Sequence, residues 1–347
     1  MKERARDQGG PGTLTDDLLV TEVYGSATDE PLAEMAARFR LRPSAARPSV
    51  FAYAGQLWAR RHFIVGFATA RNVAMYTEAR LGQLWQVLTP LLNAAVYYLI
   101  FGIILNTSRG VPDFLGFLIT GIFIFNFTQR AFITSSRVIV DSLPLIRALP
   151  FPRASLPIGY VLIELQQLVF SMIVLTAIVL GSGEPLTWYW LLALPALALQ
   201  TVFNMGMGLF LARVGSGADD FGQLMPFLVR TWMYTSGVMF SIQTISTLKK
   251  HPTLTYILQI NPAAVFISLV RNAILKSERL AWPGSQPYNA AKCALYDFKG
   301  THLENSAYCH GTVTMNQLWL YGAGWAVVAL VVGFVFFWQA ETRYGRG

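Results

Sequence analysis

Long apolar stretches constrain this chain more than any other feature of its sequence. Six stretches reach the roughly 20 mostly apolar residues that an α-helix needs to cross a bilayer. They are residues 83–105, 114–138, 157–180, 188–212, 221–244 and 317–338. Charged residues make up only 13% of the 347 residues, about half the share usual in soluble proteins. The sequence therefore predicts an all-α polytopic membrane protein with six transmembrane helices.

More than 80 residues precede the first span and contain no secretory signal. Residues 1–48 are rich in Pro, Gly and charges of both signs, which predicts a mobile cytoplasmic extension. Residues 49–82 combine aromatic residues at helical spacing with several arginines. This pattern favours an amphipathic helix lying in the headgroup layer, and an ordinary solvent-exposed amphipathic helix is the alternative.

Basic residues near the span ends indicate the orientation, because cytoplasmic flanks carry an excess of Lys and Arg. With the N-terminus inside, the inner set is Arg71, Arg80, Arg137, Arg147, Arg153, Arg213, Arg343 and Arg346, and the outer set is Arg109, Lys249, Lys250 and Lys299. We therefore expect a cytoplasmic-membrane protein with both termini in the cytoplasm. This bias accounts for most of the formal net charge of +8, and no basic stripe with interleaved aromatic residues suggests a nucleic-acid partner.

No motif for catalysis or for a bound cofactor stands out. The chain has no Gly-x-x-x-x-Gly-Lys-Ser/Thr loop to hold ATP phosphates, and its four histidines lack zinc-ligand spacing. We expect no metal, no cofactor and no enzymatic activity in this chain. Cys293 and Cys309 both fall in the predicted outer segment, where oxidising conditions favour a disulfide. Two free thiols are the alternative.

Three ionisable residues lie well inside the predicted spans, and such residues by default indicate a function. Arg130, Glu164 and Arg230 all lie roughly 10–14 Å from the cytoplasmic edge, at 1.5 Å per helical residue. The shared depth allows Arg130 to pair with Glu164, and Arg230 has no acidic residue at its level. We expect Arg230 to face an internal cavity and attract an anionic group such as a phosphate. The alternative is that all three side chains reach the headgroups separately.

Aromatic residues gather in the first and fifth predicted spans. Most aromatic residues of membrane proteins pack against other helices or form the interfacial belt. Rings with a polar tip also suit sugars, which offer apolar C–H faces beside hydroxyl groups. The candidates for such contacts are Tyr97, Tyr98, Phe101, Trp232, Tyr234 and Phe240.

Two motifs flank much of the predicted membrane region. Leu81, Gly82, Trp85, Pro90 and Leu91 form a Leu-Gly-x-x-Trp-x-x-x-x-Pro-Leu pattern at the start of the first span. Asn261-Pro262 followed by Arg271 comes after the fifth. Together with the six-span layout, these motifs resemble the ABC-2 type permeases that export polysaccharides, over roughly residues 50–338. The extension and the cysteine-bearing insert look like those of mycobacterial-type cell-wall galactan exporters.

The resemblance implies a homodimer that works with two separate ATPase subunits, which bind ATP and Mg²⁺, to export a lipid-linked polysaccharide. It implies that the first and fifth spans line the substrate channel, with Tyr97, Tyr98, Phe101, Arg230, Trp232, Tyr234 and Phe240. It places the ATPase coupling helix in residues 141–153, with Asp141, Leu143, Leu145, Arg147 and Arg153. It places re-entrant outer gate helices in residues 245–280, with Asn261, Pro262 and Arg271.

The predicted membrane domain is thus residues 83–338, including the gate segment 245–280 and an outer insert 281–316, and residues 339–347 form a cytoplasmic tail. The sequence departs from the family pattern at Asp219-Asp220, where relatives often carry Arg-Asp, and at Ser236-Gly237, where Ser-Pro is common. One alternative is an ABC-2 permease for a small amphiphile or lipid. Another is an integral-membrane glycosyl or acyl transferase, but the spans supply Glu164 as their only acidic residue.

Overall fold

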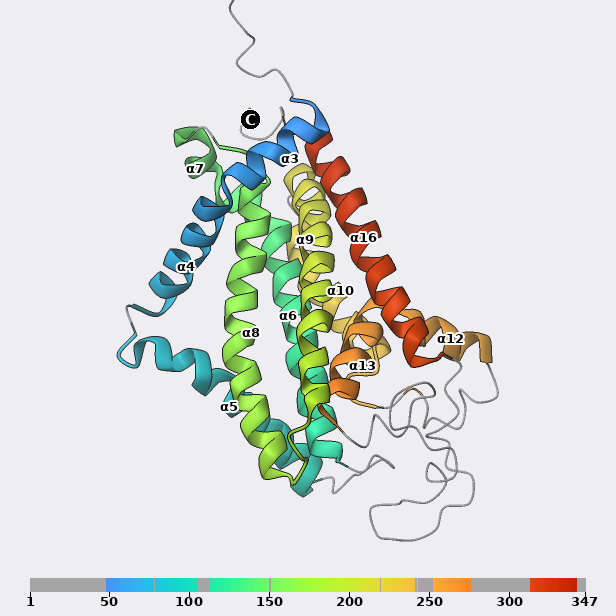
Figure 1. Ribbon diagram of the computed structural model, residues 1–347. Helices are drawn as coiled ribbons and strands as arrows, with labels where there is room; N and C mark the ends of the chain where they lie inside the picture. Colours follow the sequence, from blue (N-terminus) through green and yellow to red (C-terminus); the bar gives the residue numbers. More distant parts are fainter. Residues whose placement is uncertain are drawn as a thin grey trace, which may run out of the picture. The chain divides into compact units, whose positions relative to one another are not determined.

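The structure is a computed structural model that describes residues 48–77, 79–104, 113–149, 151–218, 220–240, 242, 252–275 and 313–341. These ranges contain helices and turns and no strand. The predicted N-terminal extension up to residue 47, the insert from 276 to 312 with Cys293 and Cys309, and the tail beyond residue 341 lie outside the described residues. The main helices are α3 (Val50–Ala59), α4 (Arg61–Thr77), α5 (Trp85–Tyr97), α6 (Phe114–Asp141), α7 (Leu143–Ala148), α8 (Ser155–Gly181), α9 (Ala193–Gly217), α10 (Phe221–Thr235), α12 (Pro252–Ile260), α13 (Pro262–Ile274) and α16 (Met315–Gln339) (Figure 1).

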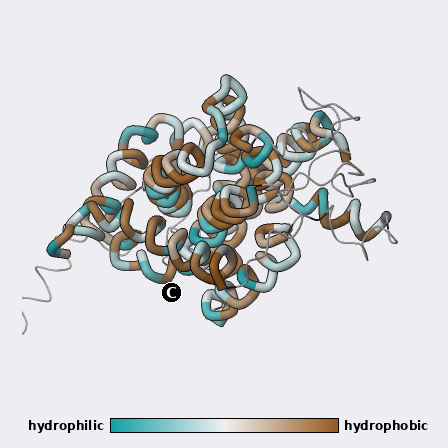
Figure 2. The backbone as a smooth tube through the Cα atoms, turned by 90° about the horizontal axis from the view of Figure 1, so that it is seen from below, coloured by the Kyte–Doolittle hydropathy of each residue, from teal (hydrophilic) through white to brown (hydrophobic). Residues whose placement is uncertain are grey.

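The long helices confirm the prediction of an all-α polytopic membrane protein. Within the described residues, five helical stretches are long and apolar enough to cross a membrane. Three of them are the helices α6, α8 and α16. The other two are Gly82–Phe101, which contains α5, and Trp188–Gly217, which contains α9. Seen from below, hydrophobic residues occur at the edge of the bundle as well as in its interior (Figure 2), as expected of helices that face lipid.

The fifth predicted span, residues 221–244, is wrong as a continuous helix. α10 ends at Thr235 after 15 residues, which is short of the roughly 20 that a bilayer needs. The chain then turns through Ser236 and Gly237, and the φ of 65° at Gly237 lies in the left-handed region that favours glycine. The sequence stays apolar past this turn, so its composition could not reveal where the helix ends.

The segment predicted to hold gate helices contains two short helices joined by a sharp bend. The axes of α12 and α13 differ by 75°, so the pair is either a broken span or a re-entrant loop. The side chain of Asn261 accepts a hydrogen bond from the backbone N–H of Ala263 and so caps α13. Pro262 takes the first helical position, where its missing N–H removes no helical hydrogen bond.

α6 is the helix around which the others pack. It contacts α8, α9, α10 and α13, and it lies between α8 and α9 in Figure 1. α16 packs along α9, and Gly206 and Gly333 allow that close approach, because a Cβ atom on either glycine would collide with backbone atoms of the facing helix. The interior of the bundle is therefore built on α6 and closed on one side by α9 and α16.

The region predicted as one amphipathic helix forms two. α3 exposes Phe51 and Trp58, at 89% and 71% of their surface, and this agrees with a helix that lies on a membrane surface. α4 packs against α8 and buries Ile64, Ala68 and Asn72. α3 and α7 lie at one end of the helical bundle, which we call the α7 end (Figure 1).

Candidate transport sites

α10 packs through one face and leaves the opposite face open. Gly222, Met225 and Val229 are buried. Arg230 and Tyr234 stand four residues apart, hence on one side of the helix, and both are exposed. Two predicted channel residues therefore lie together on a surface that the rest of the described chain leaves uncovered.

Trp232 points the other way, into the protein. Its ring stacks on Phe132, with centroids 5.6 Å apart and planes at 17°, and meets the edge of Phe125 at 5.7 Å. Its Nε1 donates a hydrogen bond of 2.9 Å to Oδ1 of Asn261. The structure thus places Trp232 in the wall between α10, α6 and α13, whereas Phe240, beyond the break, is half-buried.

Arg271 fixes the break that follows α10. Its side chain is buried, and its Nε, Nη1 and Nη2 donate to the carbonyl oxygens of Phe117, Gly237 and Val238 at 3.0, 2.9 and 2.7 Å. Its guanidinium also lies 3.3 Å from the ring centroid of Phe117. The peptide oxygens of Gly237 and Val238, in the turn that follows α10, are therefore satisfied from α13. Asn261 adds a second tie, since its Nδ2 donates to Oγ of Ser236 at 3.3 Å.

α5 and the π-helical segment Tyr98–Ile104 that continues it carry the other predicted channel residues. Tyr98 is 48% exposed, and Tyr97 is half-buried against the core. Phe101 is also half-buried and packs edge-on against Phe114, with ring centroids 6.3 Å apart. Of these three side chains, only that of Tyr98 is exposed, with about half of its surface accessible.

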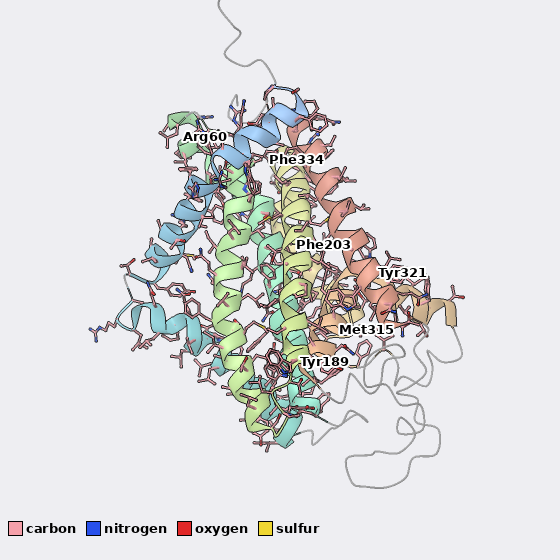
Figure 3. All side chains as sticks on the ribbon, viewed as in Figure 1. Arg60, Tyr189, Phe203, Met315, Tyr321 and Phe334 are labelled. Carbon is pink, nitrogen blue, oxygen red and sulfur yellow. The ribbon has the colours of Figure 1, made fainter. Side chains whose placement is uncertain are left out.

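An apolar cavity of about 400 Å³ opens between α6, α9, α10, α13 and α16. Trp232 and Pro262 line it, together with Phe203, which Figure 3 labels on α9. Trp325 lines its α16 side and donates from Nε1 to the carbonyl oxygen of Ile260 at 2.8 Å. The lining is hydrophobic and aromatic, so the cavity suits a hydrocarbon chain.

A second cavity, of about 40 Å³, lies between α5, α6 and α8, beside Tyr76 of α4, and most of its lining residues are polar. Arg130 and Glu164 both line it, so the structure brings the two charged residues to one site. Nη1 of Arg130 donates 2.7 Å to Oε1 of Gln167, one helical turn beyond Glu164. The remaining polar lining includes Gln86, Asn93 and Asn126.

The α7 end carries the residues predicted to couple to an ATPase. α7 occupies the middle of the predicted segment and buries Ile146, while Asp141 and Arg147 are exposed and Leu143 and Leu145 are half-buried. Arg153 donates from its backbone N–H to Oε1 of Glu341 at 3.1 Å, and from Nη1 to the carbonyl oxygen of Glu341.

Tyr53 joins α3 to the same group. Its hydroxyl donates 2.7 Å to Oε2 of Glu341 and accepts from the backbone N–H of Ala154, and its ring packs 5.9 Å from that of Phe334, labelled in Figure 3. Burial raises the pKa of the Glu341 carboxyl, and the hydrogen bonds from Tyr53 and Arg153, with the Arg153 charge, oppose that rise. We call these three residues the Tyr53–Arg153–Glu341 cluster.

Sequence reasoning missed several of these residues. Gln86, Asn126 and Gln167 are amides within apolar helices, so polarity inside a span was the signal that could have found them. Tyr53 and Glu341 are separated by 288 positions, and nothing in the local pattern of either connects them.

The fold and these sites define a polytopic membrane protein with an amphipathic helix pair before its first span and a short exposed helix, α7, between long ones. The chain belongs to the ABC-2 type transporter family, which matches residues 65–275. It is similar to an O-antigen export system permease protein RfbA of Klebsiella pneumoniae, with 25% identity over 195 residues, covering 55% of this chain and 72% of that protein. A second RfbA from the same organism is 24% identical over 213 residues, covering 59% of this chain and 79% of that protein. The family resemblance inferred from the two motifs is thereby confirmed.

Proposed function

We propose that this chain is the membrane-spanning permease of an ABC transporter that exports a lipid-linked polysaccharide, with ATP hydrolysis on separate subunits. The observation that carries the proposal is membership of the ABC-2 family together with similarity to two O-antigen export permeases. ATP and Mg²⁺ are then bound by the ATPase partner, and the present chain is a transporter subunit and not an enzyme. A cell-wall galactan is the glycan that the sequence resemblance favours.

Two copies of the chain would enclose the glycan path between the open faces of α5 and α10. The exposure of Tyr98, Arg230 and Tyr234 supports this arrangement, because an exposed arginine is costly against lipid tails. Arg230 would attract an anionic group of the substrate, and the tyrosine rings would contact sugar faces. Tyr97, Phe101, Trp232 and Phe240, which are half-buried, would shape the walls of the path.

α7 would dock in a groove of the ATPase, with Asp141, Leu143, Leu145, Arg147 and Arg153 at or beside the contact. Its buried Ile146 packs in one apolar cluster with Tyr53 and Leu57 of α3. A movement of α7 would therefore be transmitted through this cluster toward α3 and the start of α8.

This assignment makes the α7 end cytoplasmic, in agreement with the inner excess of arginines. Both termini then lie in the cytoplasm, and the protein lies in the cytoplasmic membrane. The α12–α13 pair would form the outer gate, with Pro262 starting α13 and with Asn261 and Arg271 holding the end of α10 and the turn after it in place.

Export of a small amphiphile or lipid is the second candidate, and the apolar cavity between α10 and α16 favours it. A lipid-linked glycan also has a hydrocarbon chain, so the cavity suits both. The two candidates differ in whether sugars are needed.

The test replaces Arg230 with Gln in cells that depend on this chain for surface polysaccharide. We expect surface polysaccharide to disappear and lipid-linked glycan to accumulate inside, while the variant still co-purifies with its ATPase. The matched control is Thr231→Val, because Thr231 is the next residue of α10, is exposed, and bonds only to its own helix among the described residues. Unchanged surface polysaccharide in the Arg230 variant would count against the proposed path.

A further inference from the structure

The polar cavity between α5, α6 and α8 holds hydrogen-bonding atoms that the packing of the helices leaves unused. Oε1 of Gln86 and Oε2 of Glu164 are buried and have no hydrogen-bond partner among the described residues. Both residues line the cavity. A buried acceptor without a donor is unfavourable, so these two oxygens indicate a ligand that donates hydrogen bonds.

The charges of the cavity narrow the kind of ligand. Arg130 and Glu164 line it together and are near enough to interact electrostatically. Arg130 supplies N–H donors and the carboxyl of Glu164 and the amide of Gln86 supply acceptors, so the site suits a neutral polar group better than a bare phosphate or a bare cation. It favours a neutral group that donates to the oxygens of Gln86 and Glu164 and accepts from Arg130. A hydroxyl does both.

The size of the cavity sets how much of a ligand enters. At about 10–15 Å³ for each water molecule, its 40 Å³ gives room for about three hydroxyl-sized groups. One edge of a sugar ring carries that number, and Trp85 in the lining supplies an aromatic surface for the apolar side of the ring.

We propose that this cavity binds the hydroxyl edge of a neutral sugar residue and so forms a glycan subsite apart from the open faces of α5 and α10. The inference rests on the proposed function for the source of the sugar. A lipid headgroup with a free glycerol offers the same chemistry, and the experiment separates the two sources.

Ser171 lines the cavity on α8 and provides a reporter position. The full chain carrying Ser171→Cys is placed in phosphatidylcholine nanodiscs, and the rate of its modification by methyl methanethiosulfonate is measured. We expect a lipid-linked neutral oligosaccharide, and the soluble oligosaccharide at higher concentration, to slow the reaction. The same lipid without sugar, inorganic phosphate and phosphatidylglycerol should leave it unchanged. The unsubstituted chain gives the background from its own cysteines.

Glu164→Leu in this reporter protein should raise the oligosaccharide concentration for half-protection about tenfold, the expected loss of a buried hydrogen-bond acceptor. The Glu164→Gln variant keeps one acceptor oxygen. Its oligosaccharide concentration for half-protection should therefore lie between those of the reporter protein and of its Glu164→Leu variant. Gln86→Leu tests the α5 wall independently if the leucine variant at 164 does not fold. Gln166→Leu is the matched control, because Gln166 bonds to Thr69 and Asn72 and does not line the cavity.

Protection by phosphatidylglycerol or phosphate equal to that by oligosaccharide would overturn the sugar subsite, and so would protection that the variants at 164 and 86 leave unaltered. If oligosaccharide fails to protect in a protein that still exports glycan, the subsite is wrong and the proposed function stands. If soluble oligosaccharide protects but no glycan is exported, the subsite stands and the proposed function is wrong.

Discussion

α6 and α5 are both apolar enough to cross a membrane, but the protein covers them very differently. In their most apolar stretches, 78% of the α6 residues are buried inside the protein and only 17% in the stretch that contains α5. α6 is surrounded by α8, α9, α10 and α13, whereas α5 contacts mainly α8 and the turns at its own ends. A span that the chain covers serves the fold, and a span that it leaves open is available to lipid, to a second copy or to a transported molecule. α10 resembles α5 in this respect, since it packs through one face only.

Arg271→Leu should have the largest effect, because it attacks the contact that ties the end of α10 to α6. The carbonyl oxygens of Gly237 and Val238 would lose this donor, and each buried unsatisfied group costs about 1–3 kcal/mol. We expect little folded protein, measured as the monodisperse fraction after purification in detergent. Arg230→Leu is the control, since this exposed arginine should be dispensable for folding. Equal yields of both variants would show that the break does not depend on Arg271.

Phe125→Ala on α6 and Val96→Ala on α5 test the comparison directly. Phe125 is 1% exposed, and its truncation should cost about 3–5 kcal/mol as a core cavity. Val96 is 54% exposed, and its truncation should change stability by less than about 0.5 kcal/mol. The midpoint of thermal unfolding in detergent measures both. Similar shifts in the two variants would contradict the division between covered and open spans.

Glu341→Gln should have the smallest effect and concerns the α7 end. Because burial raises the pKa of Glu341 in the folded protein, the stability from this group is complete below its unfolded pKa of about 4.3 and is lost as pH rises through the folded value. Glutamine mimics the protonated form. The unfolding midpoint of the variant, relative to the unsubstituted protein, should therefore increase with pH across that interval. If the difference in unfolding midpoint between the two proteins stays constant with pH, the titration of Glu341 does not contribute to stability.

The sequence was sufficient for the elements that depend on local composition. Five spans could be predicted because each needs only its own apolar length, and Asn261-Pro262 predicts the start of a helix because an Asn cap and a first-position Pro act locally. The end of α10 could not be predicted in this way. It depends on Arg271, 34 positions after Gly237, whose carbonyl oxygen it binds.

The directions of the side chains could not be predicted either, because they also depend on contacts between residues far apart in the chain. The helical period places Arg230 and Tyr234 on one face, but it does not reveal which face α6 covers or that Trp232 is held by Phe132 and Asn261. Likewise, the similar depth of Arg130 and Glu164 in the membrane allowed the prediction that these two residues lie close together. Only the packing of α5, α6 and α8 shows the cavity that they share and the bond from Arg130 to Gln167.

Reconstitution tests the proposed function most directly. The purified chain and its ATPase, placed together in liposomes with lipid-linked polysaccharide, should move the glycan across the bilayer when ATP is supplied, and Arg230→Gln should stop this transport without separating the two proteins. An ATPase that neither co-purifies with the chain nor is stimulated by it, or transport of the lipid alone with no dependence on the sugar, would contradict the function proposed.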